Sequence, residues 1–288
     1  MGTEIRLVVV TDDPGPGDEA LRRAVDDLES TEQALSRFRP ESELSRLNRE
    51  GTMIAGGRLR AAIEASVQAY EWSGGLLDPR VISSLEAFGY ASSLPRSDVG
   101  VVTAPGGLEP VEMRRWIEED TGRVTLPPGV RLDLAGVGKA LAIGWAAMQL
   151  AGHAGLLVDV GGDIVALGRD ERGVPWRVAV KHDKVVGEFS GDSLAVATST
   201  TTLRAWKAGG RRAHHLIDPR TGAPVESDLL FATVAAPTII EADLGAKLLI
   251  LGGIEAAAAL DERCRAVVTD RRGRTISLTG RRSAERAS

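Results

Sequence analysis

The chain has 288 residues, of which 43% are hydrophobic, 26% are charged and 33 are glycine, so we expect a sizeable core with many tight turns. Its net charge of −5 argues against non-specific nucleic-acid binding, which needs a dense cationic face. The single cysteine, Cys264, excludes an internal disulfide and a Cys/His metal cluster, and we expect it to be a buried structural thiol.

No stretch reaches the roughly 18 apolar residues that a membrane-spanning helix needs. The opening Met-Gly-Thr-Glu-Ile-Arg also lacks a charged leader followed by an apolar segment and a cleavage site. The sequence as written therefore predicts a soluble, cytoplasmic protein without a membrane span.

In the first 130 residues the apolar pattern predicts a strand at 4–11, a helix at 18–38, a loop at 39–48, a helix at 59–72 and a Pro/Gly-rich region with short strands at 92–129. The first helix carries Leu21, Val25, Leu28 and Leu35 at helical spacing. The second is expected to end before the glycine pair at 74–75.

From Arg131 the pattern predicts a strand, a glycine loop and a helix at 140–150, then strands at 156–160, through 167, at 176–180, 193–197 and 231–236. A helix at 241–251, a hairpin at 265–277 and a disordered tail at 281–288 follow. Strands and helices do not alternate regularly, so we expect an α+β fold with a mixed or antiparallel sheet. One domain over 1–280 is predicted, within which 92–130 could form a smaller subdomain.

Several standard motifs are absent. Gly136-Val-Gly138-Lys139 is no P-loop, because Asp133 stands where the first glycine is needed and Ala140 where Ser or Thr is needed. The glycine pair at 161–162 lacks the rest of a dinucleotide fingerprint. There is no Gly-x-Ser-x-Gly elbow, and no two histidines have the spacing of a zincin site.

Polar clusters at the ends of apolar segments are the remaining candidates for a site. Between Asp133 and Lys139, the amides of Gly136 and Gly138 could face an anion beside the lysine, although a plain strand-to-helix turn is the alternative. After the apolar strand, Gly161 and Gly162 permit close approach of a flat ligand or form a tight turn.

Two further clusters lie in the second half. His214 and His215 precede Asp218-Pro-Arg-Thr-Gly, which is a turn signal in its own right but could also present an imidazole at a strand end. Asp243 and Lys247 lie one turn apart on the last helix, where capping and a solvated ion pair compete with a ligand role.

The order of these motifs resembles the ApbE-like FAD:protein FMN transferase family along nearly the whole chain. The matching segments are Met1-Gly-Thr3, Ser42-x-Leu-Ser-x-Leu-Asn48, Gly75-Leu-Leu-Asp-Pro79, Asp133-Leu-Ala-Gly-Val-Gly-Lys139, Val160-Gly-Gly-Asp163, Ala197-Thr-Ser199, His215-Leu-Ile-Asp-Pro-Arg-Thr-Gly222 and Ala242-Asp243. The resemblance implies an ApbE-like, T-fold-related architecture. It also implies transfer of FMN from FAD to a Ser/Thr hydroxyl of a target flavoprotein, with Mg²⁺ present and AMP released.

The resemblance also implies roles for individual residues. FAD would be bound by Met1, Phe38, Asn48, Leu76, Leu77, Asp78, Asp133, Lys139, Gly161, Gly162 and His215. The carbonyl of Gly136 and the carboxylate of Asp243 would hold Mg²⁺, since hard oxygen ligands suit a hard cation. His215 would act near the reacting phosphate as base or orienter, with Asp243 and Lys247 beside it in the catalytic set.

Three positions depart from the family pattern. Lys247 stands where Thr or Ser is usual, and a protonated ammonium cannot ligate a metal. We therefore hypothesise that its charge replaces part of the metal's role, so that Lys247→Ala should lose activity that raised Mg²⁺ does not restore. Arg80 stands in place of Thr, and Phe38 in place of a common Tyr.

Two alternatives stay open from the sequence. Water could replace the protein hydroxyl, which would give an FAD pyrophosphatase that forms FMN and AMP. The chain could also be a non-catalytic FAD-binding protein, which would release no AMP. The target protein and the oligomeric state do not follow from the sequence.

Overall fold

The computed structural model describes residues 3–92, 98–100, 102–182 and 184–280, and these form two compact units. The first unit draws on Met1–Glu29, Lys139–Thr200 and Ser227–Ser288, and the second on Ser30–Gly138 and Thr201–Glu226. Met1 and the tail at 281–288, for which we made predictions, lie outside the described residues. The expected single domain stays a prediction.

A seven-stranded sheet in the order β1-β5-β6-β9-β14-β15-β16 forms the first unit, and every neighbouring pair is antiparallel. Its strands are β1 (Ile5–Val10), β5 (Gly155–Val160), β6 (Asp163–Gly168), β9 (Ser193–Thr200), β14 (Leu229–Ala236), β15 (Arg265–Asp270) and β16 (Thr275–Thr279). The α+β class with an antiparallel sheet is thus confirmed, as are the strands expected at 4–11, 156–167, 193–197 and 231–236 and the terminal hairpin.

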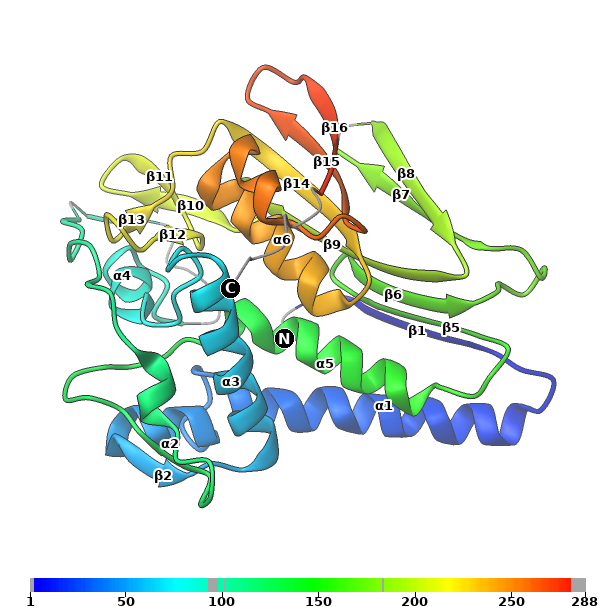
Figure 1. Cartoon of the computed structure of the whole chain (residues 1–288), viewed down its shortest axis with the longest axis horizontal. Coiled ribbons are helices and arrows are strands. Elements are labelled where there is room, and N and C mark those ends of the chain that lie inside the picture. Colours follow the sequence, from blue (N-terminus) through cyan, green and yellow to red (C-terminus); the bar gives the residue numbers. More distant parts are fainter. Residues whose placement is uncertain (1–2, 93–97, 101, 183, 281–288) are drawn as a thin grey trace, which may run out of the picture. The chain divides into compact units, whose positions relative to one another are not determined.

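Helices line one face of this sheet (Figure 1). They are α1 (Pro14–Leu35), α5 (Ala135–Gln149) and α6 (Ile239–Gly252). Their small buried residues, such as Ala24, Ala142 and Ala242, pack with Val158 and Ala197 of the strands in one apolar cluster. Because successive strand residues point to opposite faces, Val196 lies in a second cluster on the other side.

The hairpin of β7 (Trp176–Lys181) and β8 (Val185–Gly191) supplies this second cluster, through Trp176 and Val178. The strand expected at 176–180 is confirmed, whereas β8 was not expected. Its sequence, Val-Val-Gly-Glu-Phe-Ser-Gly, carries two glycines that weaken the strand pattern.

Two features of the helices that line the sheet differ from the expectation. Val25 is 43% exposed, because the alanines at 20 and 24, together with Leu28, form the buried stripe of α1. The predicted loop around Gly136 and Gly138 is instead the first turn of α5. Asp133 Oδ1 accepts a hydrogen bond from the amide of Ala135, the first residue of α5, which satisfies one backbone donor at the start of the helix.

The second unit combines short helices with small sheets. Its helices are α2 (Glu43–Glu50), α3 (Gly57–Trp72), α4 (Ile82–Ala87) and the 3₁₀ turn η1 (Met113–Trp116). Its strands are β2 (Thr52–Ile54), β3 (Asp98–Val99), β4 (Arg123–Thr125), β10 (Ala205–Ala208), β11 (Arg211–His214), β12 (Ile217–Asp218) and β13 (Ala223–Pro224). The helix expected at 59–72 is confirmed, as is the irregular region with short strands in its described parts, 98–100 and 102–129.

The loop predicted at 39–48 was wrong, because α2 begins there. Ser42 caps it by accepting a hydrogen bond from the amide of Ser45 at 2.9 Å. Gly51 ends it with a φ of 75°, in the left-handed region that favours glycine. Leu44 and Leu47, one turn apart, are fully buried.

Candidate functional site

In the first unit, two buried aspartates are each paired with a lysine. Asp163 opens β6 with a side chain only 1% exposed, and Lys139 Nζ on α5 lies 2.5 Å from its Oδ2. The other oxygen, Oδ1, accepts a hydrogen bond from the amide of Thr198 at 3.0 Å. The Asp163 carboxylate is therefore held in place from two sides.

Asp243 forms the second pair, on α6. Thr238 and Glu241 make a reciprocal capping box at the start of this helix, so Asp243 is not its cap. Lys247, one turn further on, donates to Asp243 Oδ1, and the two side chains are only 14% and 3% exposed. The remaining oxygen, Oδ2, is buried and has no hydrogen-bond partner among the described residues.

These four charges form one electrostatic cluster. Burial raises the pKa of the Asp163 carboxyl, and the negative charge of Asp243 raises it further, while Lys139 and Lys247 act in the opposite direction. With all four groups ionised, the two aspartates and two lysines sum to zero. In the part of the chain that the structure describes, no three His, Cys, Asp or Glu side chains gather as a metal site.

In the second unit, a buried arginine holds an aromatic residue and an aspartate together. Arg37 Nε lies 2.7 Å from Asp133 Oδ2, and both side chains are less than 10% exposed. Its guanidinium carbon stands 4.1 Å from the centroid of the Phe38 ring and 4.9 Å from that of Tyr90. Phe38 meets Tyr90 edge-on, with ring centroids 5.6 Å apart.

Asn48 positions the residues that lead into α5. Its side-chain amide donates to the carbonyl of Leu132 and its oxygen accepts from the Leu132 amide, both at 2.8 Å. This bidentate contact fixes the backbone next to Asp133, whose side chain accepts from the amide of Ala135, the first residue of α5.

Two Asp-Pro-Arg turns share one local geometry. Asp78 accepts from the amide and the guanidinium of Arg80, and Asp218 does the same with Arg220. Burial alone would raise the pKa of Asp218, but the hydrogen bonds and charge of Arg220 outweigh it, so the pKa lies below its ordinary value. In the other turn, Arg80 is a buried partner of Asp78, whose side chain is 1% exposed.

The histidine pair stands at the end of β11, as expected for a strand end. His214 is buried, and its Nε2 lies 3.1 Å from the carbonyl of Val225. His215 follows at a bend and is half-buried. The Asp218 turn after it closes with the amide of Gly222 donating to the Asp218 carbonyl at 2.8 Å.

Gly161 and Gly162 form the tight turn between β5 and β6, with φ values of 64° and 90°. A Cβ on Gly161 would stand 2.2 Å from Thr3 Oγ1, so only glycine fits there. The turn interpretation of this motif is confirmed, and it places Asp163 at the first position of β6.

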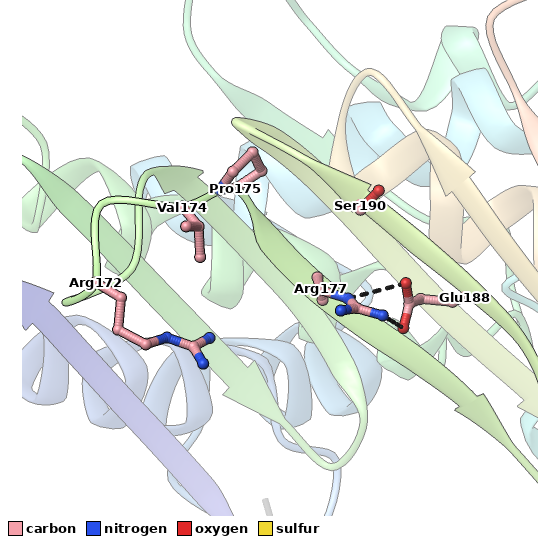
Figure 2. Close-up of a pocket in the computed structure, with 6 residues that line it drawn as sticks. All are labelled: Arg172, Val174, Pro175, Arg177, Glu188 and Ser190. Atoms are coloured by element: carbon pink, nitrogen blue, oxygen red, sulfur yellow. Dashed lines mark hydrogen bonds and ion pairs between the residues drawn. The ribbon is translucent and has the colours of Figure 1, made fainter.

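An open pocket of about 460 Å³ on the β7–β8 hairpin contains none of the predicted site residues (Figure 2). Arg177 and Glu188, which line it, form an exposed ion pair at 2.8 Å. Water screens such a pair, so it is weak. Because none of the predicted site residues lines this pocket, we do not assign the candidate site to it. Among the residues that the structure describes, no helix combines the length and apolar character needed to cross a bilayer.

Comparison with known proteins decides the family. The model of the ApbE family matches residues 1–268. The chain belongs to the ApbE family. Among curated ApbE relatives, the FAD:protein FMN transferase of Escherichia coli K12 is 26% identical over 274 residues, covering 88% of this chain and 76% of that protein. The enzyme of the same name from Klebsiella pneumoniae is 27% identical, covering 93% of this chain and 81% of that protein.

Solved ApbE structures share the fold. The ApbE protein of Thermotoga maritima has a TM-score of 0.82 at 22% identity and covers 96% of this chain, which covers 93% of it. The apo flavinyl transferase ApbE of Pseudomonas stutzeri has a TM-score of 0.79 at 23% identity, with 98% and 92% of the two chains covered. The ApbE-like architecture expected from the motifs is thus confirmed.

The structure brings together only part of the predicted ApbE site. Asp243 and Lys247 contact each other in the first unit, and Phe38 shares Arg37 with Asp133 in the second. The half-buried Leu76 and Leu77 lie beside Asp78 in the chain. These FAD-binding roles stay predictions.

Three residues that contact predicted site residues, or that fix such a contact in place, were not predicted from the sequence. Asp163 ends the Gly-Gly-Asp segment and pairs with Lys139, Thr198 anchors Asp163, and Arg37 precedes Phe38. Asp163 and Thr198 could have been singled out, because both stand in segments that carried the resemblance. Arg37 gave no such signal beyond its place next to Phe38.

One oxygen of Asp243 is a suitable ligand for a divalent cation. Its Oδ2 is a buried carboxylate oxygen that no hydrogen bond uses, which is the kind of ligand that Mg²⁺ takes. Its other oxygen is engaged by Lys247. The second predicted ligand, the carbonyl of Gly136, belongs to the other unit, so the pairing of the two stays a prediction.

Proposed function

We propose that this chain transfers the FMN moiety of FAD to a hydroxyl of a target protein. Support comes from membership of the ApbE family and from relatives named FAD:protein FMN transferase that align over most of the chain. The structural observation that carries the proposal is the buried cluster of two aspartates and two lysines, in which Asp243 Oδ2 has neither a hydrogen bond nor an ion pair among the described residues. The carboxylates of such a cluster can bind a cation, and its ammonium groups can neutralise the negative charge of a phosphate.

The reaction balances without an oxidant or a reductant. The target hydroxyl oxygen attacks the phosphorus on the FMN side of the FAD pyrophosphate, and a new phosphorus–oxygen bond forms. The phosphorus–oxygen bond to AMP breaks, so AMP leaves. The hydroxyl loses its proton, for which we propose His215 as base or orienter. The product is FMN joined to the protein by a phosphodiester.

We propose roles for the chain's own residues in this step. Lys139 is 32% exposed and points its ammonium at the fixed carboxylate of Asp163, which makes it a preoriented positive charge for a phosphate group. Phe38 would stack on a ring of FAD through the face opposite Arg37. Positioning and charge neutralisation of this kind are what phosphoryl transfer requires.

We propose that Mg²⁺ is held by Asp243 Oδ2 and the carbonyl of Gly136. When bound, it would neutralise negative charge that builds on the phosphate oxygens. We further propose that the target carries a Ser or Thr within a short Asp-Gly-…-Ser/Thr-Gly-Ala-Thr/Ser segment. A location in the cytoplasm stays a prediction, which fractionation of cells making the protein would test.

Product analysis tests the function. The purified protein is incubated with FAD and Mg²⁺, with an acceptor domain carrying the segment or with the same domain whose Ser/Thr is replaced by Ala. We expect AMP and a flavin-labelled acceptor in the first case, and no label in the second. Free FMN with AMP in both would identify a pyrophosphatase, and intact FAD in both would identify a flavin-binding protein without catalysis.

A further inference from the structure

We propose that Lys247 is an exchangeable counter-ion that couples cation binding at Asp243 to the arrival of FAD. The inference rests on the proposed function and adds to it a coupling between the binding of the cation and the binding of FAD. In the structure, Lys247 engages one oxygen of Asp243 and leaves the other buried without a hydrogen bond. A lysine thus already serves as the positive partner where a divalent cation is expected.

Charge balance is the first argument. Asp163, Asp243, Lys139 and Lys247 sum to zero, and the two carboxylate side chains are only 1% and 3% exposed. A divalent cation added alone would give the cluster, its two ammonium groups included, a net charge of about +2. A net charge of this size is unfavourable in a poorly solvated place. The pyrophosphate of FAD brings the compensating negative charge. Cation and FAD are therefore expected to favour each other.

The chemistry of lysine is the second argument. An ammonium on a flexible four-carbon stem is a mobile point charge with three donors and binds phosphate as readily as carboxylate. The Lys247 side chain is 14% exposed, against 3% for that of Asp243, so it is the more accessible of the pair. When a phosphate arrives, Lys247 can turn to it and release Asp243 Oδ1, after which both oxygens of Asp243 are open to a cation.

Reciprocal coupling follows from linkage: if FAD raises the affinity for the cation, the cation raises the affinity for FAD by the same factor. Coupling of this kind is commonly about 5- to 150-fold. We expect at least about 10-fold in the wild-type protein. Removing the lysine charge should tighten cation binding in the absence of FAD, because a competitor for Asp243 is gone, and should reduce the coupling factor.

Mn²⁺ binding read by electron paramagnetic resonance tests this without an activity assay. Free Mn²⁺ is titrated with the full-length protein, without and with FAD, in the absence of acceptor, after correction for Mn²⁺ bound by FAD alone. FAD affinity is measured in parallel by flavin fluorescence, without and with Mn²⁺, and chromatography checks that FAD stays intact. Lys247→Met and Lys247→Gln remove the charge, and Lys247→Arg keeps it.

A matched control is Arg177→Met, which removes a cation from an exposed ion pair of the same unit (Figure 2) and should change nothing. The expected result is strong coupling in the wild type, tighter Mn²⁺ binding without FAD in the folded neutral variants, and a coupling factor at least about 5-fold smaller in them. Equal Mn²⁺ affinity in wild type and neutral variants, or no coupling in the wild type, overturns the inference.

Flavin transfer and the coupling through Lys247 are distinguished by separate measurements. Flavin transfer without the Lys247-dependent coupling would leave the proposed function standing and remove this inference. Coupling without any transfer or AMP release would leave this inference standing and remove the proposed function. The wild-type titration needs no variant, so misfolding of one substitution leaves a decisive measurement in place.

Discussion

Arg37 is a buried cation of the second unit that contacts several groups at once. It contacts Asp133 through its Nε at 2.7 Å and donates to the carbonyl of Tyr90 at 2.5 Å. It also covers one face of Phe38. The guanidinium thus joins three segments of the chain, and the loss of its charge would leave the Asp133 carboxylate buried without compensation.

Arg37→Met should therefore lower the free energy of unfolding by about 3–5 kcal/mol, the usual cost of breaking a buried ion pair. Adding Asp133→Asn to Arg37→Met should recover a large part of this loss, because the amide oxygen can still accept from Ala135 without a buried charge. Urea denaturation of the single and double variants measures both. A cost below about 1 kcal/mol for Arg37→Met would contradict this account of the pair.

Cys264 illustrates a residue whose reactivity follows from its surroundings. It is 2% exposed, and burial, followed by the nearby charges of Glu241 and Asp261, raises the pKa of its thiol to about 11. Since only the thiolate reacts, iodoacetamide at pH 8 should modify the folded protein very slowly and the urea-unfolded protein quickly. Mass spectrometry follows the labelling, and rapid labelling of the folded chain would contradict the buried placement.

At the scale of the elements, one arrangement recurs in the turns: an aspartate side chain accepts hydrogen bonds within the turn, and an arginine two residues later forms an ion pair with it. It occurs at Asp78, Asp170, Asp218 and Asp261, and the hairpin turn at Asp270 uses the amide of Arg272 and the side chain of Arg274. The Asp-Pro turn signal predicted one of these turns, the one at Asp218. The pairing itself comes from side-chain geometry that turn rules do not specify.

The Asp218 turn should stabilise the fold in a pH-dependent way. Its folded pKa is below the unfolded value of about 3.9, so its contribution is present above that value and is lost as pH falls through the folded pKa. Asp218→Asn should be less stable than wild type at pH 6, and the difference should shrink below about pH 4. Urea midpoints across pH test this, with the exposed Asp12→Asn as control. A pH-independent difference would contradict it.

The capping box of α6 supports the helix that carries Asp243. Thr238→Ala removes the oxygen that accepts from the Glu241 amide at 3.2 Å and should cost about 1 kcal/mol, within the 0.5–2 kcal/mol range of N-cap losses. Thermal or urea unfolding measures it, with the exposed Thr103→Ala as a control that should stay within about 0.5 kcal/mol. No loss in Thr238→Ala would mean that the cap is not formed in solution.

The elements that could be predicted are those with a strong apolar period, such as β5, β14 and α6. The errors have local physical causes. α2 is only eight residues long with two buried leucines, so its pattern is too short to separate from a loop. The glycines at 136 and 138 are weak helix formers, yet α5 begins before them, where Asp133 accepts from the amide of Ala135.

For the candidate site, motif order predicted Asp243 and Lys247, which contact each other, but not their surroundings. Asp163 lies 80 residues from Asp243 in the chain, and only folding places them within electrostatic range. Likewise the contact of Arg37 with Asp133 joins segments far apart in sequence. Long-range pairing of this kind leaves no mark in local spacing, which is why the sequence alone could not provide it.

At the scale of the whole molecule, the central claim is that this ApbE family member attaches FMN to a protein hydroxyl. Its most direct test is the intact mass of an acceptor domain after incubation with FAD, Mg²⁺ and either the wild-type protein or Asp243→Asn. We predict that the wild type adds the mass of FMN less one water to the acceptor, and that Asp243→Asn, folded by circular dichroism, adds label at least about 100-fold more slowly. An acceptor that keeps its mass with the wild type would contradict the central claim, and equal rates for the two proteins would contradict the place given to Asp243.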